Sequence, residues 1–416
     1  MDGTDESSTD TSGYIMSNDY RNKAAAFAAG EKAFRLGFLP TEQSNPLTRG
    51  LDRIMAADTP AGVRILQRVD REVLAMARKV LAGTGFKALI EAGTAAIVNG
   101  HKIIFSGCGA TGRLSILLEA MWRRFLIDLQ TRQPETRPWA SELENAVESI
   151  MTGGDYALIR AVEFFEDYAE FGRQQVREAQ MTAGDILVAI TEGGETSSVL
   201  GTVSEAARRG ARVFLLFNNP AELLRTHLER SREAIENPAV TVLDLHCGPM
   251  AIAGSTRMQA TTSEQLIAGA ALELILGNVL QARERQAAPA GYRRPADYAA
   301  DFAALLNELE AEAAVKALAG YIDFETDIYF HNGLVTYLAD DYLLDIFTDT
   351  TERSPTFMLP PFRKRGDEIS PCSWAFVKHP SLATPEAWQH CLSRPPRCLN
   401  WTAGDYRRLG AGAAIA

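Results

Sequence analysis

Two segments of the chain share one pattern: an apolar run leads into a turn rich in glycine and hydroxyl residues, and a helix follows. HKIIFSGCGATGR begins at residue 101, and DILVAITEGGETSS begins at residue 185. ARVFLLFNN at 211–219 and VTVLDL at 240–245 are further apolar runs of the kind found in buried strands. Strand–turn–helix units in succession are typical of a parallel sheet with helices on both faces. The sequence therefore predicts a three-layer, parallel-sheet α/β domain over residues 99–286.

The residues that flank this domain differ from it in composition. Residues 1–19 are rich in Ser, Thr, Asp and Gly, which predicts a disordered tail. Residues 20–98 are predicted to be a helical lead-in that opens with an Ala-rich helix at 21–37. Pro40 and Pro46 interrupt the helical pattern, and apolar side chains then recur every three or four positions from about 59 to 98. Residues 287–297 contain Pro and Gly and are predicted to be a linker.

The residues after the linker weakly repeat the order of the first domain. A helical stretch at 298–319 precedes apolar runs at 327–332 and 372–379, which we expect to be strands. This order predicts a second, shorter copy of the domain over residues 298–416. The copy is expected to be incomplete or degenerate, because no further strand follows.

Composition narrows the class of partner. Asp and Glu number 53 against 42 Lys and Arg, and a net charge of −11 argues against binding to nucleic acid or to an anionic membrane. The five cysteines form no CxxC pair, so neither a zinc site nor a disulfide framework is predicted. The Gly-rich turn at 106–113 is neither GxGxxG with a suitably placed acid nor GxxxxGK[ST], and no cofactor is expected. A basic leader and an apolar run of 18 residues are both missing from the sequence, which predicts a cytoplasmic protein.

Three turns are candidates for binding an anion, at 106–113, 191–198 and 248–266. Each precedes a helix, where backbone N–H groups and the helix dipole favour negative charge. Because the carboxyl ends of parallel strands meet at one edge of a sheet, the turns should converge on one crevice and hold a phosphorylated ligand. The residues expected to bind it are Gly109, Ala110, Thr111, Gly112, Gly193, Gly194, Thr196, Ser197, Ser255, Thr256 and Arg257. Taken singly, the glycines could simply make tight turns, and the Ser and Thr residues could cap helices.

Several motifs, in their order along residues 39–286, resemble one known family. They are TEQSNP at 41–46, LDRI at 51–54, GCGATGRL at 107–114, MTGGDYALIRAVEFFED at 151–167 and GSTRM at 254–258. They are similar to motifs of N-acetylmuramic acid 6-phosphate etherase and of the related glucokinase regulatory protein. The resemblance implies a SIS domain, the sugar-phosphate-binding α/β domain of sugar isomerases. It also implies that the second block resembles the second SIS domain of the regulatory protein.

The resemblance implies roles for two positions. The etherase uses one Glu on the helix after the first turn as an acid, and a second Glu in an AVEGAE stretch. The second corresponds to Glu166, which becomes the candidate catalytic residue, whereas Met121 stands where the acid is expected. Glu119 is two helical positions away, about 200° around the axis, and should face elsewhere. Ether elimination needs a base for the C2 proton and an acid for the departing lactate oxygen, so Met121 bears directly on activity.

Other positions also depart from the family pattern. Gln259 stands where the family has the Lys that follows GSTRM. Glu192 and Glu195 flank the second turn and would repel a phosphate dianion if their side chains pointed inward.

Three functions remain open at this stage. The first is an etherase-like carbon–oxygen lyase that cleaves a lactyl ether by acid–base elimination. The second is a sugar-phosphate sensor without catalysis, for which the resemblance to the regulatory protein would imply a kinase partner. The third is a sugar-phosphate isomerase. A homodimer, or a pseudo-dimer formed by the two blocks of one chain, is expected because etherase-like SIS domains pair.

Overall fold

The computed structural model describes residues 19–31, 35–158, 165–255, 257–284, 293–331, 333, 335–350 and 375–412. The chain divides into two compact units, Met1–Phe38 and Leu39–Ala416. The first unit contains helix α1 (Asp19–Gly30). The predicted helix at 21–37 is too long, because residues 35–38 are not helical. The predicted disordered tail lies outside the described residues, apart from Asp19, which begins α1.

A five-stranded parallel sheet forms the centre of the second unit, with the order β2-β1-β3-β4-β5. The strands are β1 (Ile103–Gly107), β2 (Val147–Met151), β3 (Ile186–Ile190), β4 (Arg212–Phe217) and β5 (Val240–Asp244). Ile103 of β1 pairs with Val147 on one side and Ile186 on the other. The chain therefore adds β2 on one side of β1, and then crosses to the other side of β1 to add β3, β4 and β5. The carboxyl ends of β1 and β3 form the switch point at which such sheets bind ligands.

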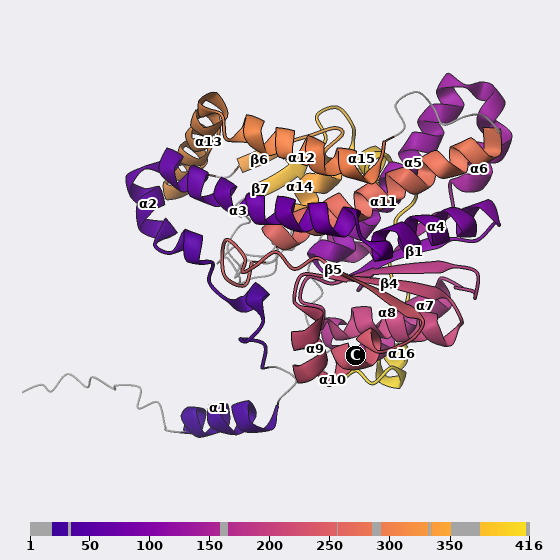
Figure 1. Cartoon of the computed structure of the whole chain (residues 1–416), viewed down its shortest axis with the longest axis horizontal. Helices are drawn as coiled ribbons and strands as arrows, with labels where there is room; N and C mark the ends of the chain where they lie inside the picture. The colour runs from indigo at the N-terminus through magenta and orange to yellow at the C-terminus, as the bar shows by residue number, and fades with distance from the viewer. Residues whose placement is uncertain are drawn as a thin grey trace, which may run out of the picture. The chain divides into compact units, whose positions relative to one another are not determined.

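Helices cover both faces of this sheet, as Figure 1 shows. One face carries α4 (Thr84–Val98), α5 (Ala110–Arg132) and α11 (Gln259–Glu284). The other face carries α7 (Ala169–Glu178), α8 (Ser197–Arg208), α9 (Ala221–His227) and α10 (Glu229–Ile235). Because both faces are covered, β1 and β3 are buried along their whole length, which explains their uninterrupted apolar runs. The predicted three-layer, parallel α/β architecture is confirmed.

Two glycines let α7 and α8 approach closely. A Cβ atom on Gly172 of α7 would lie 1.8 Å from the backbone oxygen of Ser198. A Cβ atom on Gly201 of α8 would lie 2.0 Å from the backbone oxygen of Ala169. This contact fixes the first turn of α8, at the end of β3, beside the segment that leads into α7.

Helix α11 is part of the core. Its Gln259–Arg283 stretch is long and apolar enough to cross a membrane by length and composition. In the fold, however, α11 contacts α4, α5 and α3 (Thr59–Leu81), and Ile267, Ile275 and Val279 are fully buried there. These apolar side chains of α11 therefore pack in the core of the protein.

The residues beyond the predicted linker form helices around a two-stranded parallel sheet. Strand β6 (Val335–Leu338) pairs with β7 (Ala375–Lys378). The helices are α12 (Pro295–Leu309), α13 (Glu312–Phe330), α14 (Leu343–Thr350), α15 (Thr384–Leu392) and α16 (Ala403–Arg408). The end of the predicted linker at 287–297 already belongs to α12. A second SIS-like copy over 298–416 stays a prediction, with which this small parallel sheet is compatible.

The two strands predicted in this second block had different outcomes. The strand predicted at 372–379 is confirmed as β7. The strand predicted at 327–332 is wrong, because α13 continues to Phe330. The run DIYF has strand-forming side chains, but α13 is anchored by Val315 and Ala319, which pack with Val63 of α3, and the helix continues past them.

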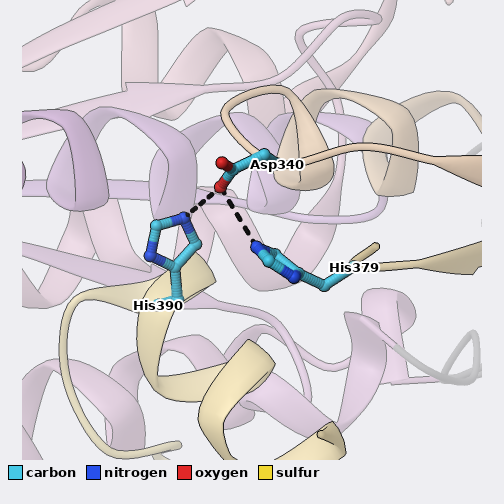
Figure 2. Close-up of side chains that lie close together, drawn as sticks. All are labelled: Asp340, His379 and His390. Carbon is cyan, nitrogen blue, oxygen red and sulfur yellow. Dashed lines mark hydrogen bonds and ion pairs between the residues drawn. The ribbon is translucent and has the colours of Figure 1, made fainter. Parts of the chain in front are cut away.

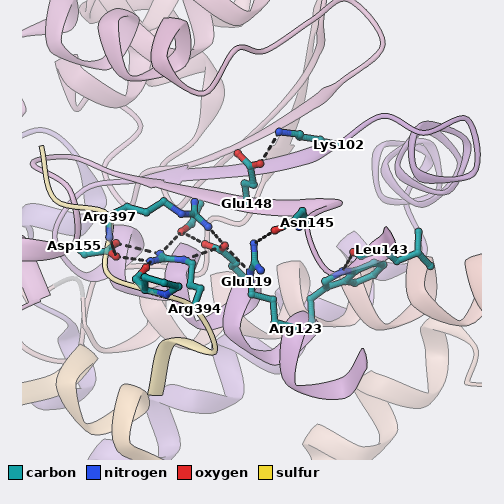
Figure 3. Close-up of polar contacts among 12 residues, drawn as sticks. Lys102, Glu119, Arg123, Leu143, Asn145, Glu148, Asp155, Arg394 and Arg397 are labelled. Atoms are coloured by element: carbon teal, nitrogen blue, oxygen red, sulfur yellow. Dashed lines mark hydrogen bonds and ion pairs between the residues drawn. The ribbon is translucent and has the colours of Figure 1, made fainter. Parts of the chain in front are cut away.

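The residues after α15, 393–412, form a C-terminal segment that contacts the chain next to edge strand β2. Cys398 forms a β-bridge with Gly154, just after edge strand β2. The backbone N–H of Asp155 donates to the Arg397 oxygen at 3.0 Å, and the Arg397 N–H donates to Asp155 Oδ2 at 2.6 Å. Figure 3 shows Arg394 and Arg397 reaching from this segment to Glu119 on α5. The C-terminal segment therefore pairs with the chain just beyond the end of edge strand β2.

Candidate functional site

The first turn, between β1 and α5, is held by short-range contacts. A Cβ atom on Gly107 would lie 2.3 Å from the carbonyl carbon of Thr111, so only glycine fits there. Thr111 Oγ1 accepts from the Cys108 N–H at 3.0 Å and donates to the Cys108 oxygen at 2.8 Å. Gly109 is the N-cap of α5, with a φ of 56°, and Ala110–Gly112 form the buried first turn. The predicted residues of this turn therefore surround the start of α5.

The second turn, between β3 and α8, is tied to neighbouring loops. The Gly193 oxygen accepts from Asn219 Nδ2 at 2.9 Å, and the Gly194 oxygen accepts from Ser231 Oγ at 2.9 Å. Thr196 is the N-cap of α8, but its side chain makes no capping hydrogen bond; Thr191 Oγ1 donates to it instead. Ser197 opens the helix. The start of α8 therefore lacks a side-chain cap, which is the condition under which an anion can bind there.

The third turn lies before α11. Ser255 is 2% exposed, and its Oγ makes no hydrogen bond among the described residues. Thr256 lies outside the described residues. Arg257 is partly buried and acts electrostatically on Glu192 of the second turn. Gln259 is fully buried: its Nε2 donates to the Pro249 oxygen at 2.7 Å, and its Oε1 accepts from the Ala251 N–H at 2.7 Å. The residue at the family's Lys position therefore holds this turn together.

The TEQSNP segment docks on the same edge of the sheet. Asn219 Nδ2, just after β4, donates to Thr41 Oγ1 at 3.0 Å. Asn45 Nδ2 donates to the Pro249 oxygen at 2.8 Å, and the Gly254 N–H donates to the Thr41 oxygen at 3.3 Å. The motif thus connects the turn that contains GSTRM to the end of β4.

Glu166 lies on the one-turn 3-10 helix η6 (Phe165–Asp167) and is partly buried. Cys108 Sγ of the first turn is 3.8 Å from Glu166 Oε2 and donates a hydrogen bond to it. Burial raises the pKa of the Cys108 thiol, and the charge of Glu166 adds to the rise, so the thiol stays protonated. Glu166 is thus placed beside the Gly-rich turn, as an acceptor. The neighbouring Glu163 lies outside the described residues.

The C-terminal segment packs against Phe165, the residue before Glu166. The ring of Phe165 is 5.6 Å from that of Tyr406 on α16 and 5.2 Å from that of Phe171 on α7. Both contacts are edge-to-face, the favourable geometry for aromatic pairs. Residues about 240 positions apart in sequence therefore fix the backbone next to Glu166.

Met121 is remote from these turns. Its side chain is 59% exposed, on a continuous α5 that begins at Ala110. Eleven positions along a helix correspond to roughly 16 Å. Glu119 is fully buried and binds Arg123, Arg394 and Arg397 (Figure 3). Neither residue lies at the start of α5, where the first turn and Glu166 meet.

The structure adds two carboxyls that the sequence did not assign to the site, the partly buried Glu192 and the fully buried Glu264. Burial raises the pKa of Glu192 to about 7, and Glu166 adds to the rise, while Arg113 and Arg257 oppose it. Burial, followed by the charge of Glu192, raises the pKa of Glu264 well above its usual range. Asn218 Nδ2 donates to Glu264 Oε1 at 2.9 Å, whereas Glu264 Oε2 makes no hydrogen bond among the described residues.

The sequence signals for these additional residues were weak. Arg113 is the arginine of GCGATGRL, so the motif itself could have marked it. The sequence marks Glu192 only as a source of repulsion, and Glu264 has the pattern of an ordinary helix residue. The charge of Glu192 acts on Glu264, although the two residues are far apart in the sequence, so no local pattern reveals their interaction.

A separate cluster of Asp340, His379 and His390 lies near the small sheet (Figure 2). Asp340 Oδ1 is 3.1 Å from His379 Nε2 and 2.8 Å from His390 Nε2. His379 Nδ1 accepts from the backbone N–H groups of Ser381 and Leu382, so a neutral ring carries its proton on Nε2. A metal would need the lone pair of that nitrogen, so these residues fit a hydrogen-bonded cluster better than a metal centre.

The geometry defines the class of protein. Uncapped helix starts and Gly-rich turns meet at the switch point of a parallel sheet, as in α/β domains that bind phosphorylated ligands. The family of the glucokinase regulatory protein N-terminal SIS domain matches residues 87–207.

Curated relatives extend this match. An N-acetylmuramic acid 6-phosphate etherase of a Picosynechococcus species is 32% identical over 229 residues, covering 54% of this chain and 65% of that protein. The etherase of Bacillus pumilus is 30% identical, covering 56% of this chain and 67% of that protein. The chain spans just under two thirds of the length of the first relatives that it matches. Phosphoheptose isomerase from Neisseria gonorrhoeae aligns at 17% identity over 54% of this chain and 98% of that one, with a TM-score of 0.33, too low to add to the assignment.

The chain belongs to the SIS-domain family, in the group that contains the N-acetylmuramic acid 6-phosphate etherases and the glucokinase regulatory protein. This confirms the resemblance drawn from the motifs.

Proposed function

We propose that the protein binds a phosphorylated amino sugar at the β1/β3 switch point and cleaves a lactyl ether by elimination. The observation that carries this proposal is the position of Glu166, next to Cys108 in the first turn. The relatives named as etherases supply the substrate class, N-acetylmuramic acid 6-phosphate.

The charges at the site suit an anionic ligand. Arg113 and Arg257 supply two guanidinium groups that act on Glu192. The raised pKa values leave part of the Glu192 population and much of the Glu264 population protonated near neutral pH, so they repel a phosphate less than fully ionised carboxylates would. Glu195 does not add to the repulsion, because it pairs with Arg230. The repulsion expected from the sequence is therefore small.

The chemistry requires a base and an acid. Glu166 accepts a hydrogen bond from a protonated thiol, which suits a carboxylate that takes the C2 proton of the sugar. That proton is acidic when the sugar is in its open-chain aldehyde form. Met121 cannot protonate the leaving lactate, because it has no ionisable group and lies on an exposed part of α5.

The test is incubation of the folded protein with N-acetylmuramic acid 6-phosphate, with lactate measured enzymatically. Wild type is expected to release lactate, and Glu166→Gln is expected to lower the rate by about 10²–10⁴-fold, the usual contribution of a general base. If folded wild type at high concentration releases no lactate, the etherase proposal is wrong.

A second candidate is a sugar-phosphate sensor without turnover. It is favoured by Met121 at the acid position and by the match to the regulatory protein's SIS domain. This candidate predicts a thermal shift with fructose 6-phosphate and related esters, reaching about 2.7 kcal/mol of stabilisation at 100 times Kd. Binding without lactate release would select the sensor over the lyase.

The assembly and location of the protein also remain proposals. An intrachain pseudo-dimer, a homodimer, a kinase partner and a cytoplasmic location are compatible with family membership. Light scattering of the purified protein would distinguish a monomeric pseudo-dimer from a homodimer.

A further inference from the structure

The end of β3 carries a carboxyl group that the family comparison does not assign. Glu192 follows β3 directly, and its backbone oxygen accepts from the Asn218 N–H at 2.9 Å. This bond ties Glu192 to the end of β4, so its backbone belongs to the rigid edge of the sheet. The side chain interacts electrostatically with Glu166, Arg113 and Arg257, which belong to the other two turns and to η6.

The geometry points to Glu192 as the proton donor to the departing lactate oxygen, in the role that Met121 cannot fill. This inference rests on the proposed lyase function and adds a second catalytic residue to it. The charges of Glu166 and Glu192 both act on the thiol of Cys108 in the first turn. The two carboxyls come from different parts of the sheet edge: Glu192 directly follows β3, and Glu166 lies on η6, after β2.

The charged and titratable groups that interact with Glu192 come from several neighbouring elements. They are Arg113 of α5, Arg257 before α11, Glu264 of α11, Glu166 of η6 and Cys108 after β1. Burial raises the pKa of Glu192 to about 7, which leaves a large protonated fraction near neutral pH. A general acid works best when its pKa lies near the working pH. Glu166, in contrast, accepts a hydrogen bond from Cys108, so the two carboxyls have separate roles.

The proposed step conserves atoms and charge. Glu166 takes the C2 proton, the electrons of that bond form the C2–C3 double bond, and the C3–oxygen bond breaks. Glu192 transfers its proton to the oxygen that leaves, which yields lactate. Addition of water across the double bond then reverses both proton transfers, so each carboxyl returns to its starting state and an N-acetylhexosamine 6-phosphate remains.

The experiment uses full-length protein and N-acetylmuramic acid 6-phosphate in D₂O. The variants are Glu192→Gln, Glu166→Gln and Glu195→Gln. The last is a matched control on the same turn, because its carboxylate pairs with Arg230. Lactate release measures the whole elimination, and deuterium at C2 of the recovered substrate measures proton abstraction alone. Circular dichroism and thermal unfolding show that each variant is folded.

Glu192→Gln is expected to lower lactate release by about 10²–10⁴-fold while C2 exchange persists, because only the acid is removed. Glu166→Gln should lose both signals, and Glu195→Gln should stay within threefold of wild type. Two results with an active wild type would overturn the acid role while leaving the lyase function in place. One is unchanged lactate release in Glu192→Gln, and the other is a loss of C2 exchange that parallels its loss of lactate release. If wild type shows neither signal, the lyase function and the role of Glu192 both fail.

Discussion

Arg394 Nε, from the C-terminal segment, lies 3.1 Å from Oε1 of Glu119 on α5, and both side chains are almost completely buried (Figure 3). Arg394 also binds Asp155 after β2, and Ser149 Oγ donates to Glu119 Oε2 at 2.6 Å. The contact joins the last part of the chain to the helix that follows β1. Glu119 is therefore held in ion pairs away from the first turn.

Glu119→Gln should destabilise the protein by about 3–5 kcal/mol, because it leaves the buried Arg394 partly unpaired. Burial alone would raise the pKa of Glu119, but Arg394, Arg397, Ser149 and Arg123 together lower it. Urea unfolding measures the loss, and limited proteolysis should release the C-terminal segment sooner in the variant. Because the folded pKa is lowered, this stabilisation is present above the unfolded pKa and is lost as pH falls.

Glu148→Gln is the matched control for this prediction. Glu148 pairs with Lys102 at 2.6 Å on the neighbouring part of the sheet, but the Lys102 side chain is 40% exposed. An accessible pair contributes at most about 1 kcal/mol. Equal losses of unfolding free energy in the two variants would show that the buried ion pairs of Glu119 stabilise the protein no more than the accessible Lys102–Glu148 pair does.

Gly172→Ala should destabilise the protein severely, because its new Cβ would overlap the Ser198 oxygen and separate α7 from α8. We expect a loss of about 3 kcal/mol or more, together with weaker sugar-phosphate binding, since Ser198 is in the first turn of α8. Thermal unfolding and ligand-induced thermal shift measure the two effects.

Gly269→Ala in α11 is the corresponding control. No atom lies within 4 Å of a Cβ built there, and Ala stabilises a helix interior by up to about 1 kcal/mol relative to Gly. If Gly269→Ala gains stability and Gly172→Ala loses it, the loss at Gly172 comes from the close packing of α7 on α8 and not from the Gly→Ala change itself. A stable Gly172→Ala protein would contradict the close approach.

Glu192→Gln should make the protein more stable relative to wild type as pH rises from about 4.5 to 7. Burial raises the pKa of Glu192 to about 7, so wild type loses stability as the unfolded chain ionises first. Each pKa unit corresponds to 1.36 kcal/mol, which gives a difference on the order of 3 kcal/mol at pH 8. Urea unfolding at pH 5 and pH 8 measures it, and identical pH profiles for the variant and wild type would refute the raised pKa.

Tyr406→Ala should lower lactate release without abolishing folding. Tyr406 contacts Phe165, Phe171 and Trp401, and each aromatic pair contributes about 0.5–1.5 kcal/mol. The expected stability loss from the three pairs is therefore about 1.5–4.5 kcal/mol. Phe165 directly precedes Glu166, so losing the ring that packs on Phe165 should displace Glu166 and lower kcat. Tyr406→Phe keeps the ring and should restore kcat. Full activity in Tyr406→Ala would show that α16 does not position Glu166.

Local patterns were sufficient to predict most of the first domain. β1 and β3 are apolar runs followed by glycine turns, and this combination is specific because buried parallel strands need apolar side chains on both faces. The same reasoning failed for DIYF at 327–330, where strand-forming side chains sit at the end of an anchored helix. Propensity is a weak guide wherever packing on a neighbouring helix decides the backbone.

The sequence by itself therefore determined the family, the parallel sheet and the turns that could bind a phosphate, because these depend on residues close together in the chain. Tertiary structure alone decided that Met121 faces solvent, that Glu119 binds Arg394, and that the charge of Glu192 acts on the buried Glu264. Those outcomes depend on contacts between distant segments. The protonation of a carboxyl group also depends on its burial and on the charges that packing brings to it.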